Sequence, residues 1–241
     1  GTRGASLGVD AIKIAALDYG SSLFNRIESV EIKTENQMLF ETAATPYAKR
    51  IKGIVAIYER VAKAVSETLK NKDFPIVLAG DHSTAGGTVA GIKMTYPKSK
   101  LGVIWIDAHA DIHSPYTTPT GNVHGMPMAA NLGEDNLAHK INKPDKETVD
   151  LWTKMKKIGG MSPKITYKDI VYIAVRDIEP QEAYLLKKHN VKMISAAEVK
   201  RIAVEKIVRN ALAHLSHCTH IYVSFDVDSM DCDLISKGTG T

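Results

Sequence analysis

Acidic and imidazole side chains alternate in the sequence directly after two apolar segments, residues 101–106 and 220–225. The first run carries Asp107, His109 and Asp111, and the second carries Asp226 and Asp228. Alternate residues of an extended chain point to the same side, so the side chains of each run can converge if the chain stays extended. Carboxylates mixed with imidazole suit divalent ions such as Mn²⁺, Zn²⁺ or Fe²⁺. The spacing therefore predicts metal chemistry where these two apolar segments end.

A third polar sequence, Gly80-Asp81-His82-Ser83, follows the apolar run Pro75 to Ala79. Alone it is a weak signal, because a His at a strand end is more often a hydrogen-bonded structural residue. Asp226-x-Asp228 alone could be a helix cap or a turn. Leaving Asp81 aside, the three sequences supply two His and four Asp as candidate ligands, and four carboxylates beside buried strand ends would be strongly destabilising without cations. Two divalent ions carry the matching charge, and ions ~3.5–4 Å apart lower the pKa of a water that they share.

Two more histidines lie close to the first run. His113 continues the same alternation and could be one more ligand. His124 belongs to a Gly-containing loop sequence, residues 118–125, directly after the predicted ligands. An imidazole there could carry protons near neutral pH, or it could pack beneath the site as a structural residue. The spacing leaves both roles for His124 open.

A separate group of metal-ligand residue types occurs near residue 217: His214, His217, Cys218 and His220. It could be a zinc cluster, but no second ligand pair stands at the usual spacing. We favour the simpler interpretation that these imidazoles end an amphipathic helix, where a positive charge interacts favourably with the helix dipole. The second cysteine, Cys232, is interpreted as a loop thiol.

Composition narrows the class of protein. The 241 residues are 44% hydrophobic and 24% charged with a net charge of +4, as in an ordinary soluble globular protein. No apolar run approaches the ~20 residues of a membrane helix. Lysines in residues 140–168 supply much of the positive charge, without a motif for stacking bases, so neither a nucleic acid nor a membrane is an expected partner. Two cysteines predict no disulfide framework, which agrees with a cytoplasmic protein.

Strand and helix patterns alternate along most of the chain, which favours parallel βαβ units and a sheet covered on both faces. Strands are expected at residues 27–32, 75–79, 101–106, 169–175, 191–194 and 220–224. Helices are expected at residues 5–19, 45–70, 85–94, 125–132, 180–189 and 196–215, with a loop and at most one helix in residues 134–166. Ligands of such folds bind outside the carboxyl ends of the strands, where the polar sequences lie.

The motifs resemble those of a known family, the ureohydrolases, and within it arginase. The resemblance rests on five sequences in family order: Gly80-Asp81-His82-Ser83, Trp105-Ile-Asp107-Ala-His109-Ala-Asp111, Thr120-Gly-Asn122-Val-His124-Gly125, Val175-Arg176-Asp177 and Ser224-Phe225-Asp226-Val-Asp228. The third of these separates arginase from agmatinase-type members. The resemblance implies an α/β fold, a three-layer αβα domain with a mainly parallel sheet, over residues 1–241.

The resemblance also implies a cluster of two Mn²⁺ ions and the hydrolysis of L-arginine to L-ornithine and urea by a metal-bridging hydroxide. His82 and Asp111 would bind one ion, His109 and Asp228 the other, and Asp107 and Asp226 would bridge both. His124 would carry protons, and His124 and Asp111 are the predicted catalytic residues. The predicted contacts to the amino-acid end of the substrate are Thr118, Thr120, Asn122, Glu179 and Glu182.

The sequence departs from the family pattern at two pocket positions. His113 stands where arginases usually carry an Asn that binds the α-carboxylate, and Glu179 stands where Asp is usual. Both changes concern substrate selection, so His113 is now interpreted as a substrate-binding residue. Two alternatives stay open beside arginase: a ureohydrolase for agmatine or guanidinobutyrate, and a homologue of the same fold without catalysis.

The resemblance also sets expectations about the extent of the chain. Family sequences continue past Thr239-Gly-Thr241 with a strand–helix section that includes a Glu for the guanidinium, and they begin with a strand that this chain lacks. We therefore expect the 241 residues alone to be weakly active or inactive. The full-length protein is expected to be a homo-oligomer, a trimer or a hexamer.

Overall fold

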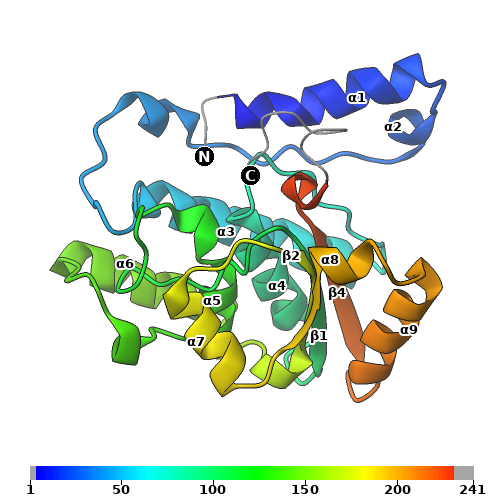
Figure 1. Ribbon diagram of the computed structural model, residues 1–241. Helices are drawn as coiled ribbons and strands as arrows, with labels where there is room; N and C mark the ends of the chain where they lie inside the picture. Colours follow the sequence, from blue (N-terminus) through cyan, green and yellow to red (C-terminus); the bar gives the residue numbers. More distant parts are fainter. Residues whose placement is uncertain (1–3, 231–241) are drawn as a thin grey trace.

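A four-stranded parallel sheet lies at the centre of the computed structural model, which describes residues 4–230 (Figure 1). Its strands are β1 (Leu101–Ile106), β2 (Ile170–Val175), β3 (Lys192–Ser195) and β4 (His220–Phe225). The helices are α1 (Gly8–Asp18), α2 (Leu23–Arg26), α3 (Ile51–Lys70), α4 (Thr84–Thr95), α5 (Pro127–Leu132), α6 (Lys146–Lys157), α7 (Pro180–Lys188), α8 (Ala196–Val199) and α9 (Val204–His214). The α/β fold predicted from the sequence is confirmed.

The strand order β3-β2-β1-β4 places the two ligand-bearing strands, β1 and β4, side by side. Trp105 of β1 pairs in register with Ser224 of β4. The hydrogen bonds continue past the strands, because the Asp226 amide donates to the Ile106 carbonyl at 2.9 Å and the Asp107 amide donates to the Ile173 carbonyl at 3.1 Å. The loops that carry the acidic residues are thus fixed to one another at the carboxyl edge of the sheet.

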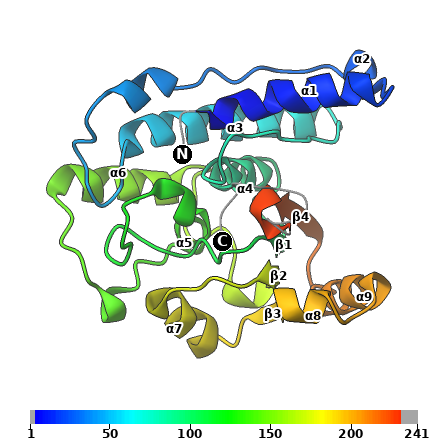
Figure 2. The same cartoon turned by 45° about the horizontal axis from the view of Figure 1, so that its top comes forward.

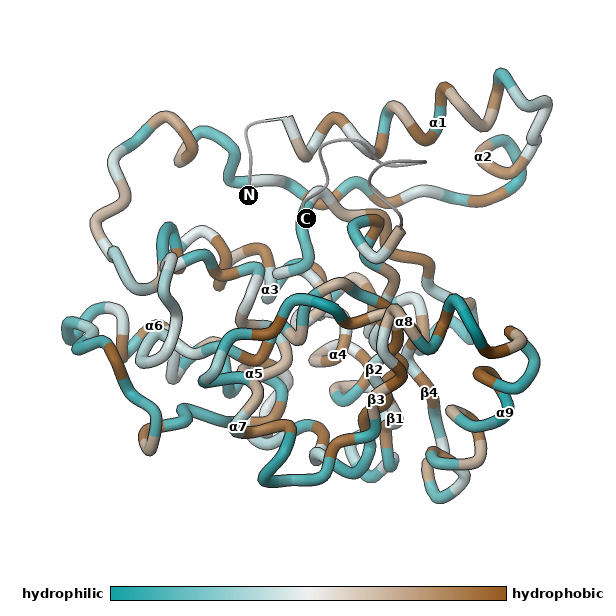
Figure 3. Tube along the Cα trace, viewed as in Figure 1, coloured by the Kyte–Doolittle hydropathy of each residue, from teal (hydrophilic) through white to brown (hydrophobic). Residues whose placement is uncertain are grey.

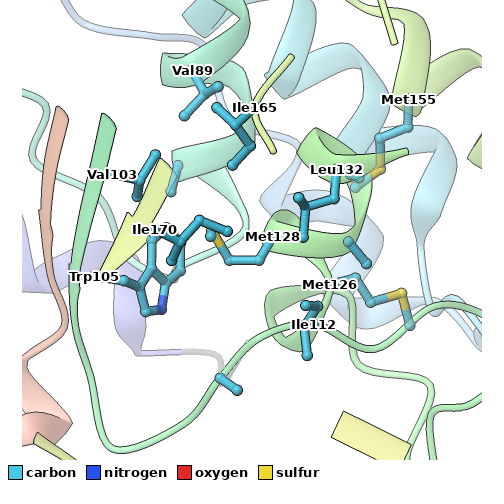
Figure 4. Close-up of a cluster of buried hydrophobic side chains, with 14 of the residues drawn as sticks. Val89, Val103, Trp105, Ile112, Met126, Met128, Leu132, Met155, Ile165 and Ile170 are labelled. Atoms are coloured by element: carbon cyan, nitrogen blue, oxygen red, sulfur yellow. The ribbon is translucent and has the colours of Figure 1, made fainter. Parts of the chain in front are cut away.

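Apolar side chains bury both faces of the central strands. Figure 4 shows Trp105 and Val103 of β1 together with Met128 and Leu132 of α5, on the face that α3, α4 and α5 cover. On the opposite face α9 contributes Ala211 to a smaller apolar cluster, and it lies across the sheet from α5 in both views (Figures 1 and 2). A hydrophobic band in Figure 3 follows the strands. Burial from both sides explains why β1 and β2 read as continuous apolar runs.

Close contact between α3 and α4 depends on glycine. A Cβ on Gly91 would lie 2.6 Å from the carbonyl oxygen of Ala62, and one on Gly86 would lie 2.2 Å from the hydroxyl oxygen of Tyr58. Separations this short are far below van der Waals contact, so larger residues would force the helices apart. Since His82 lies just before α4, this packing holds the start of that helix in place near the sheet edge.

Two predicted strands are wrong. Residues 27–32 and 75–79 form no strand, and Phe74 and Ile76 expose 88% and 65% of their surface. Gly80 passes instead beside the backbone of Ala5 at the start of the N-terminal helical segment. An apolar run becomes a strand only when a neighbouring strand accepts its hydrogen bonds, and no described strand lies beside the outer edge of β4. The chain therefore delivers His82 from a turn rather than from a strand end.

Other elements match the expectations with shifted ends. The helix expected from residue 45 begins at Ile51, because Thr45 bonds the Ala48 carbonyl in a turn and Arg50 adopts a left-handed φ of 60°. Two-sided coverage holds for β1 and β2 but is wrong for β4, where Val223 is 55% exposed. Within residues 4–230, none of the helices has the length and apolar content that crossing a bilayer requires.

Candidate metal centre

The first group of metal-ligand side chains surrounds His82, immediately before α4. Its Nδ1 lies 2.8 Å from Asp107 Oδ2, 3.1 Å from Asp111 Oδ2 and 3.2 Å from Asp226 Oδ2. These atoms come from the turn after residue 80, the loop after β1 and the loop after β4. Residues up to 144 positions apart in sequence thus offer one nitrogen and three oxygens to a single point.

A second group surrounds His109 and shares one residue with the first. His109 Nδ1 lies 3.4 Å from Asp107 Oδ1 and 3.1 Å from Asp228 Oδ2. Asp107 therefore directs Oδ2 to His82 and Oδ1 to His109, and its side chain is only 1% exposed. The carboxylate of Asp107 lies between the two groups.

Turns, rather than an extended chain, bring these side chains together. The residues after Ile106 leave the strand, and Asp111 adopts a left-handed φ of 50°. As a result Asp111 turns to His82 while His109 turns to Asp228. The prediction of one alternating ligand face is wrong in its geometry, although the residues it named do converge. A left-handed Asp at the point of convergence is a strained conformation of the kind found at functional sites.

Two residues that the sequence interpretation left without a role orient the ligands. Trp105 Nε1 donates to Asp107 Oδ2 at 2.9 Å, and its ring stacks on His82 with centroids 4.0 Å apart. Ser224 Oγ lies 2.7 Å from His82 Nε2. Both precede a predicted ligand by two positions and pair in register across β1 and β4. Their position on the same strand face as the predicted ligands is the sequence signal that could identify them. Hydrogen bonds from such residues outside the ligand set fix the orientation of ligating side chains.

The crowded carboxylates and imidazoles perturb one another. Burial, followed by the charge of Asp107, raises the pKa of Asp111 to about 7. Hydrogen bonds to Asp107 and Asp228 raise the pKa of His109 to about 11. Burial alone would lower the pKa of His82, but its three carboxylate neighbours raise it well above the usual range.

His124 lies beside the cluster in a short 3-10 helix, Val123–Gly125, that follows the loop of residues 118–122. Burial lowers its pKa, and the charges of His109 and Asp226 act on it as well. Thr118 supports this loop, since its Oγ1 accepts the Gly121 amide at 2.9 Å. The other two predicted contacts in the loop are Thr120, whose Oγ1 accepts the Asn122 amide at 3.2 Å, and Asn122 itself, which is partly buried.

His113 does not join the two groups around Asp107 but contacts the predicted pocket carboxylates. Its Nε2 lies 2.6 Å from Glu179 Oε2 and 3.7 Å from Glu182 Oε2, and its Nδ1 lies 3.0 Å from Thr117 Oγ1. Glu182 caps α7 and accepts the Ile112 and Glu179 amides. Burial raises the pKa of Glu182 to about 8. The two departures from the family pattern, His113 and Glu179, are therefore in direct contact.

The histidines near residue 217 do not form one cluster. His220 stacks on Tyr96 and bonds its neighbour Thr219. His217 and Cys218 instead meet Asp169, at the opposite end of the sheet from the residues around Asp107. Cys232 lies outside the described residues.

Comparisons with known proteins identify the family that this chain resembles. The family model described as "Arginase family" matches residues 1–241. Human arginase-1 is 40% identical over 185 residues, which are 76% of this chain and 52% of that protein. The structure of Bacillus caldovelox arginase aligns with a TM-score of 0.76 at 28% identity, over 97% of this chain and 73% of that one.

A third similar protein is the Entamoeba histolytica arginase solved in complex with L-ornithine. It aligns with a TM-score of 0.67 at 25% identity, over 80% of this chain and 60% of that one. Across the curated arginases, this chain spans between 52% and 74% of the length of its relatives. The match of the family model to every residue, together with these relatives, assigns the chain to the arginase family.

Proposed function

We propose that this protein is an arginase-type ureohydrolase that uses two Mn²⁺ ions to cleave L-arginine to L-ornithine and urea. The observation that carries the proposal is the arrangement around Asp107, whose two oxygens face two separate imidazole–carboxylate groups. An arrangement with one shared carboxylate suits two neighbouring ions better than one. Membership of the arginase family supports the same chemistry.

The side chains fit the proposed ions. His82 Nδ1 is buried within 3.2 Å of three carboxylate oxygens, yet none of these contacts has the geometry of a hydrogen bond. A nitrogen lone pair and several carboxylate oxygens aimed at one point form the donor set that Mn²⁺ or a similar ion takes. His82, Asp107, Asp111 and Asp226 would hold one ion, and Asp107, His109 and Asp228 the other. Asp226 contacts His82 at 3.2 Å, and its bridging of both ions stays a prediction. Bound there, the ions would supply positive charge that lowers the pKa of a water for attack on the guanidinium.

The chain's own residues would place the substrate and move the protons. The carboxylates at the carboxyl edge of the sheet attract a cationic guanidinium. Asp177, with Oδ2 3.8 Å from His109 Nε2, extends this group of carboxylates to the surface. His124 would be the proton carrier. Its burial lowers its pKa, so the imidazole is neutral near pH 7 and can accept a proton before delivering it to the departing amine.

The amino-acid end of the substrate would lie toward α7 and the loop of residues 118–122. Glu179 is half exposed at the start of α7 and would receive the α-ammonium, with Glu182 buried behind it. Asn122, Thr118 and Thr120 would face the α-carboxylate. The Entamoeba histolytica arginase was solved with L-ornithine, an amino acid that carries both of these groups.

The contact between His113 and Glu179 favours a second candidate substrate class. When His113 Nε2 donates to Glu179 Oε2 at 2.6 Å, it occupies one acceptor oxygen of the carboxylate that would bind an α-ammonium. A guanidino compound without an amino-acid end, such as agmatine or guanidinobutyrate, would not need that carboxylate. The alternative is therefore a ureohydrolase of the same mechanism with a different substrate.

A substrate panel tests both candidates. The purified full-length protein is reconstituted with Mn²⁺, and urea release is measured from L-arginine, agmatine and guanidinobutyrate. The proposal expects the highest kcat/KM with L-arginine and loss of turnover in Asp107→Asn. Preference for agmatine or guanidinobutyrate would replace the first candidate by the second. Absence of urea from all three, in a protein that binds two Mn²⁺ ions, would favour the homologue without catalysis.

The family resemblance also leads us to propose a cytoplasmic homo-oligomer, a trimer or a hexamer, with no nucleic acid or membrane partner. Light scattering of the purified protein would measure the mass. A monomer at micromolar concentration would contradict the oligomer.

A further inference from the structure

We propose that Asp169, His217 and Cys218 form a second, independent metal site that takes Zn²⁺ or a similarly thiophilic divalent ion. The three residues lie at the amino edge of the sheet, directly before β2 and β4. In Figure 1 the chain enters β4 at the bottom of the view and leaves it at the top, so this site and the residues around Asp107 lie at opposite ends. The proposed hydrolysis does not use these residues.

The donor atoms already converge. His217 Nε2 lies 2.7 Å from Asp169 Oδ1 and 3.5 Å from Cys218 Sγ, and Cys218 Sγ lies 3.9 Å from the same Asp169 oxygen. A tetrahedral zinc with ordinary bond lengths separates a sulfur ligand from a nitrogen or oxygen ligand by roughly 3.6 Å, and nitrogen from oxygen by roughly 3.4 Å. Both sulfur distances are within about 0.3 Å of these values. The His217–Asp169 contact needs to open by about 0.7 Å for both atoms to bind one ion.

Surrounding contacts orient the carboxylate. Thr166 donates its amide and its hydroxyl to Asp169 Oδ2, at 3.2 and 2.6 Å. These two bonds leave Oδ1 directed at His217 and Cys218. An outer hydrogen bond that holds one oxygen while the other binds the ion is a regular feature of protein metal sites.

The fold also makes room for the thiol. Cys218 reaches over β1 at Gly102, where an added Cβ would lie 3.2 Å from its sulfur. Asp169 is mostly buried, whereas the His217 side chain is 35% exposed, so an ion can enter from solvent. Three protein ligands beside solvent leave the fourth tetrahedral position to water.

A catalytic thiol explains the geometry less well. In a Cys–His–Asp triad the imidazole contacts the thiol through one nitrogen and the carboxylate through the other. Here both contacts belong to His217 Nε2, so the imidazole cannot pass a proton from one partner to the other. Burial and the neighbouring Asp169 raise the pKa of Cys218, which also disfavours a free thiolate.

Three nearby lysines act on the ligands of the proposed site and still leave it able to bind an ion. Lys100 and Lys168 act on Cys218 and favour its thiolate, while Lys93 acts on Asp169. Lys93 Nζ donates to the Ser99 carbonyl at 2.6 Å.

Metal binding at this site releases protons. The ion replaces the thiol proton of Cys218, which is released to solvent, and the proton that His217 shares with Asp169 moves to Nδ1 or to water. No oxidant or reductant is needed, because the metal keeps its charge.

Cobalt distinguishes this site from the carboxylate cluster, because only a thiolate ligand gives the intense sulfur-to-cobalt charge-transfer absorption in the near ultraviolet. The metal-stripped full-length chain is titrated with Co²⁺ and then with Zn²⁺ as competitor. We expect the band in the wild type and in Cys232→Ser, its loss in Cys218→Ser, and at least tenfold weaker binding in His217→Gln. Cys232 is the other cysteine of the sequence, so Cys232→Ser is the matched control.

Two further measurements do not depend on cobalt or on activity. Wild-type protein equilibrated with Zn²⁺ should contain one more equivalent per chain than Cys218→Ser, whatever the carboxylate cluster holds. Zn²⁺ should also slow alkylation of Cys218 by iodoacetamide at least tenfold in the wild type and not in His217→Gln. A missing band in the wild type, a band lost in Cys232→Ser, or an alkylation rate unchanged by Zn²⁺ would overturn the proposal.

Discussion

Replacing Asp107 by Asn tests whether one carboxylate serves both groups of the proposed metal centre. Asp107 Oδ2 faces His82 at 2.8 Å and Oδ1 faces His109 at 3.4 Å, so the substitution removes charge from both groups. Asp228 is the matched comparison, because among the imidazoles it contacts only His109, at 3.1 Å. We expect Asp107→Asn to lose about two Mn²⁺ ions per chain and Asp228→Asn to lose about one.

The size of the effect follows from metal linkage. At a free Mn²⁺ concentration of about 100 times the dissociation constant, each bound ion stabilises the folded state by about 2.7 kcal/mol. Two ions then contribute about 5.4 kcal/mol, and a domain of this size gains about 2–4 °C in Tm per kcal/mol. Mn²⁺ should therefore raise the Tm of the wild type by about 10–20 °C, that of Asp228→Asn by about half as much, and that of Asp107→Asn little.

Elemental analysis and differential scanning calorimetry, with and without Mn²⁺, measure the two quantities independently. Asn keeps the shape of the Asp107 side chain, and its amide oxygen can still accept the Trp105 Nε1 hydrogen bond. Equal metal counts in Asp107→Asn and Asp228→Asn would show that Asp107 belongs to one ion only. The reasoning from its two oxygens would then be refuted, whatever the activity of the protein.

Three more predictions follow from the neighbouring contacts. Trp105→Phe removes the donor to Asp107 and should weaken Mn²⁺ binding about 10–100-fold in a metal titration, with stacking on His82 retained. Because the folded state raises the pKa of Glu182 from 4.5 to about 8, it holds that proton more tightly than the unfolded chain does. The free energy of unfolding should thus fall by several kcal/mol as pH rises from 4.5 through 8, and Glu182→Gln should flatten this slope in urea denaturation. His113→Asn and Glu179→Asp should couple by about 1 kcal/mol in kcat/KM for L-arginine, since the bond is short but Glu179 is half exposed; additive effects would disconnect the pair.

Local sequence patterns predict the buried strands of this fold well and its exposed segments poorly. The strand at residues 101–106 has the same ends in the structure as in the sequence analysis, because both of its faces are covered and its apolar run stops where the acidic residues begin. Residues 75–79 carry an equally apolar run, yet they form no strand. A run of apolar residues records a preference for burial, whereas a strand also requires a partner for its backbone, and only the three-dimensional structure contains that information.

The same distinction separates the residue types of the candidate site from its geometry. Acid and imidazole at alternate positions are enough to identify Asp107, His109 and Asp111 as ligands. Together with Asp226 and Asp228 they place four carboxylates beside buried strand ends, and such a group tolerates burial only when cations neutralise it. Alternation nevertheless predicts one common ligand face, while the left-handed backbone at Asp111 sends it to His82 and leaves His109 to Asp228. Asp169 and His217 show even more clearly that sequence spacing does not predict contact. They are 48 positions apart, and the parallel order of β2, β1 and β4 brings them together. Residue chemistry therefore identifies which side chains need an ion, but the backbone conformation and strand order decide which of them share one.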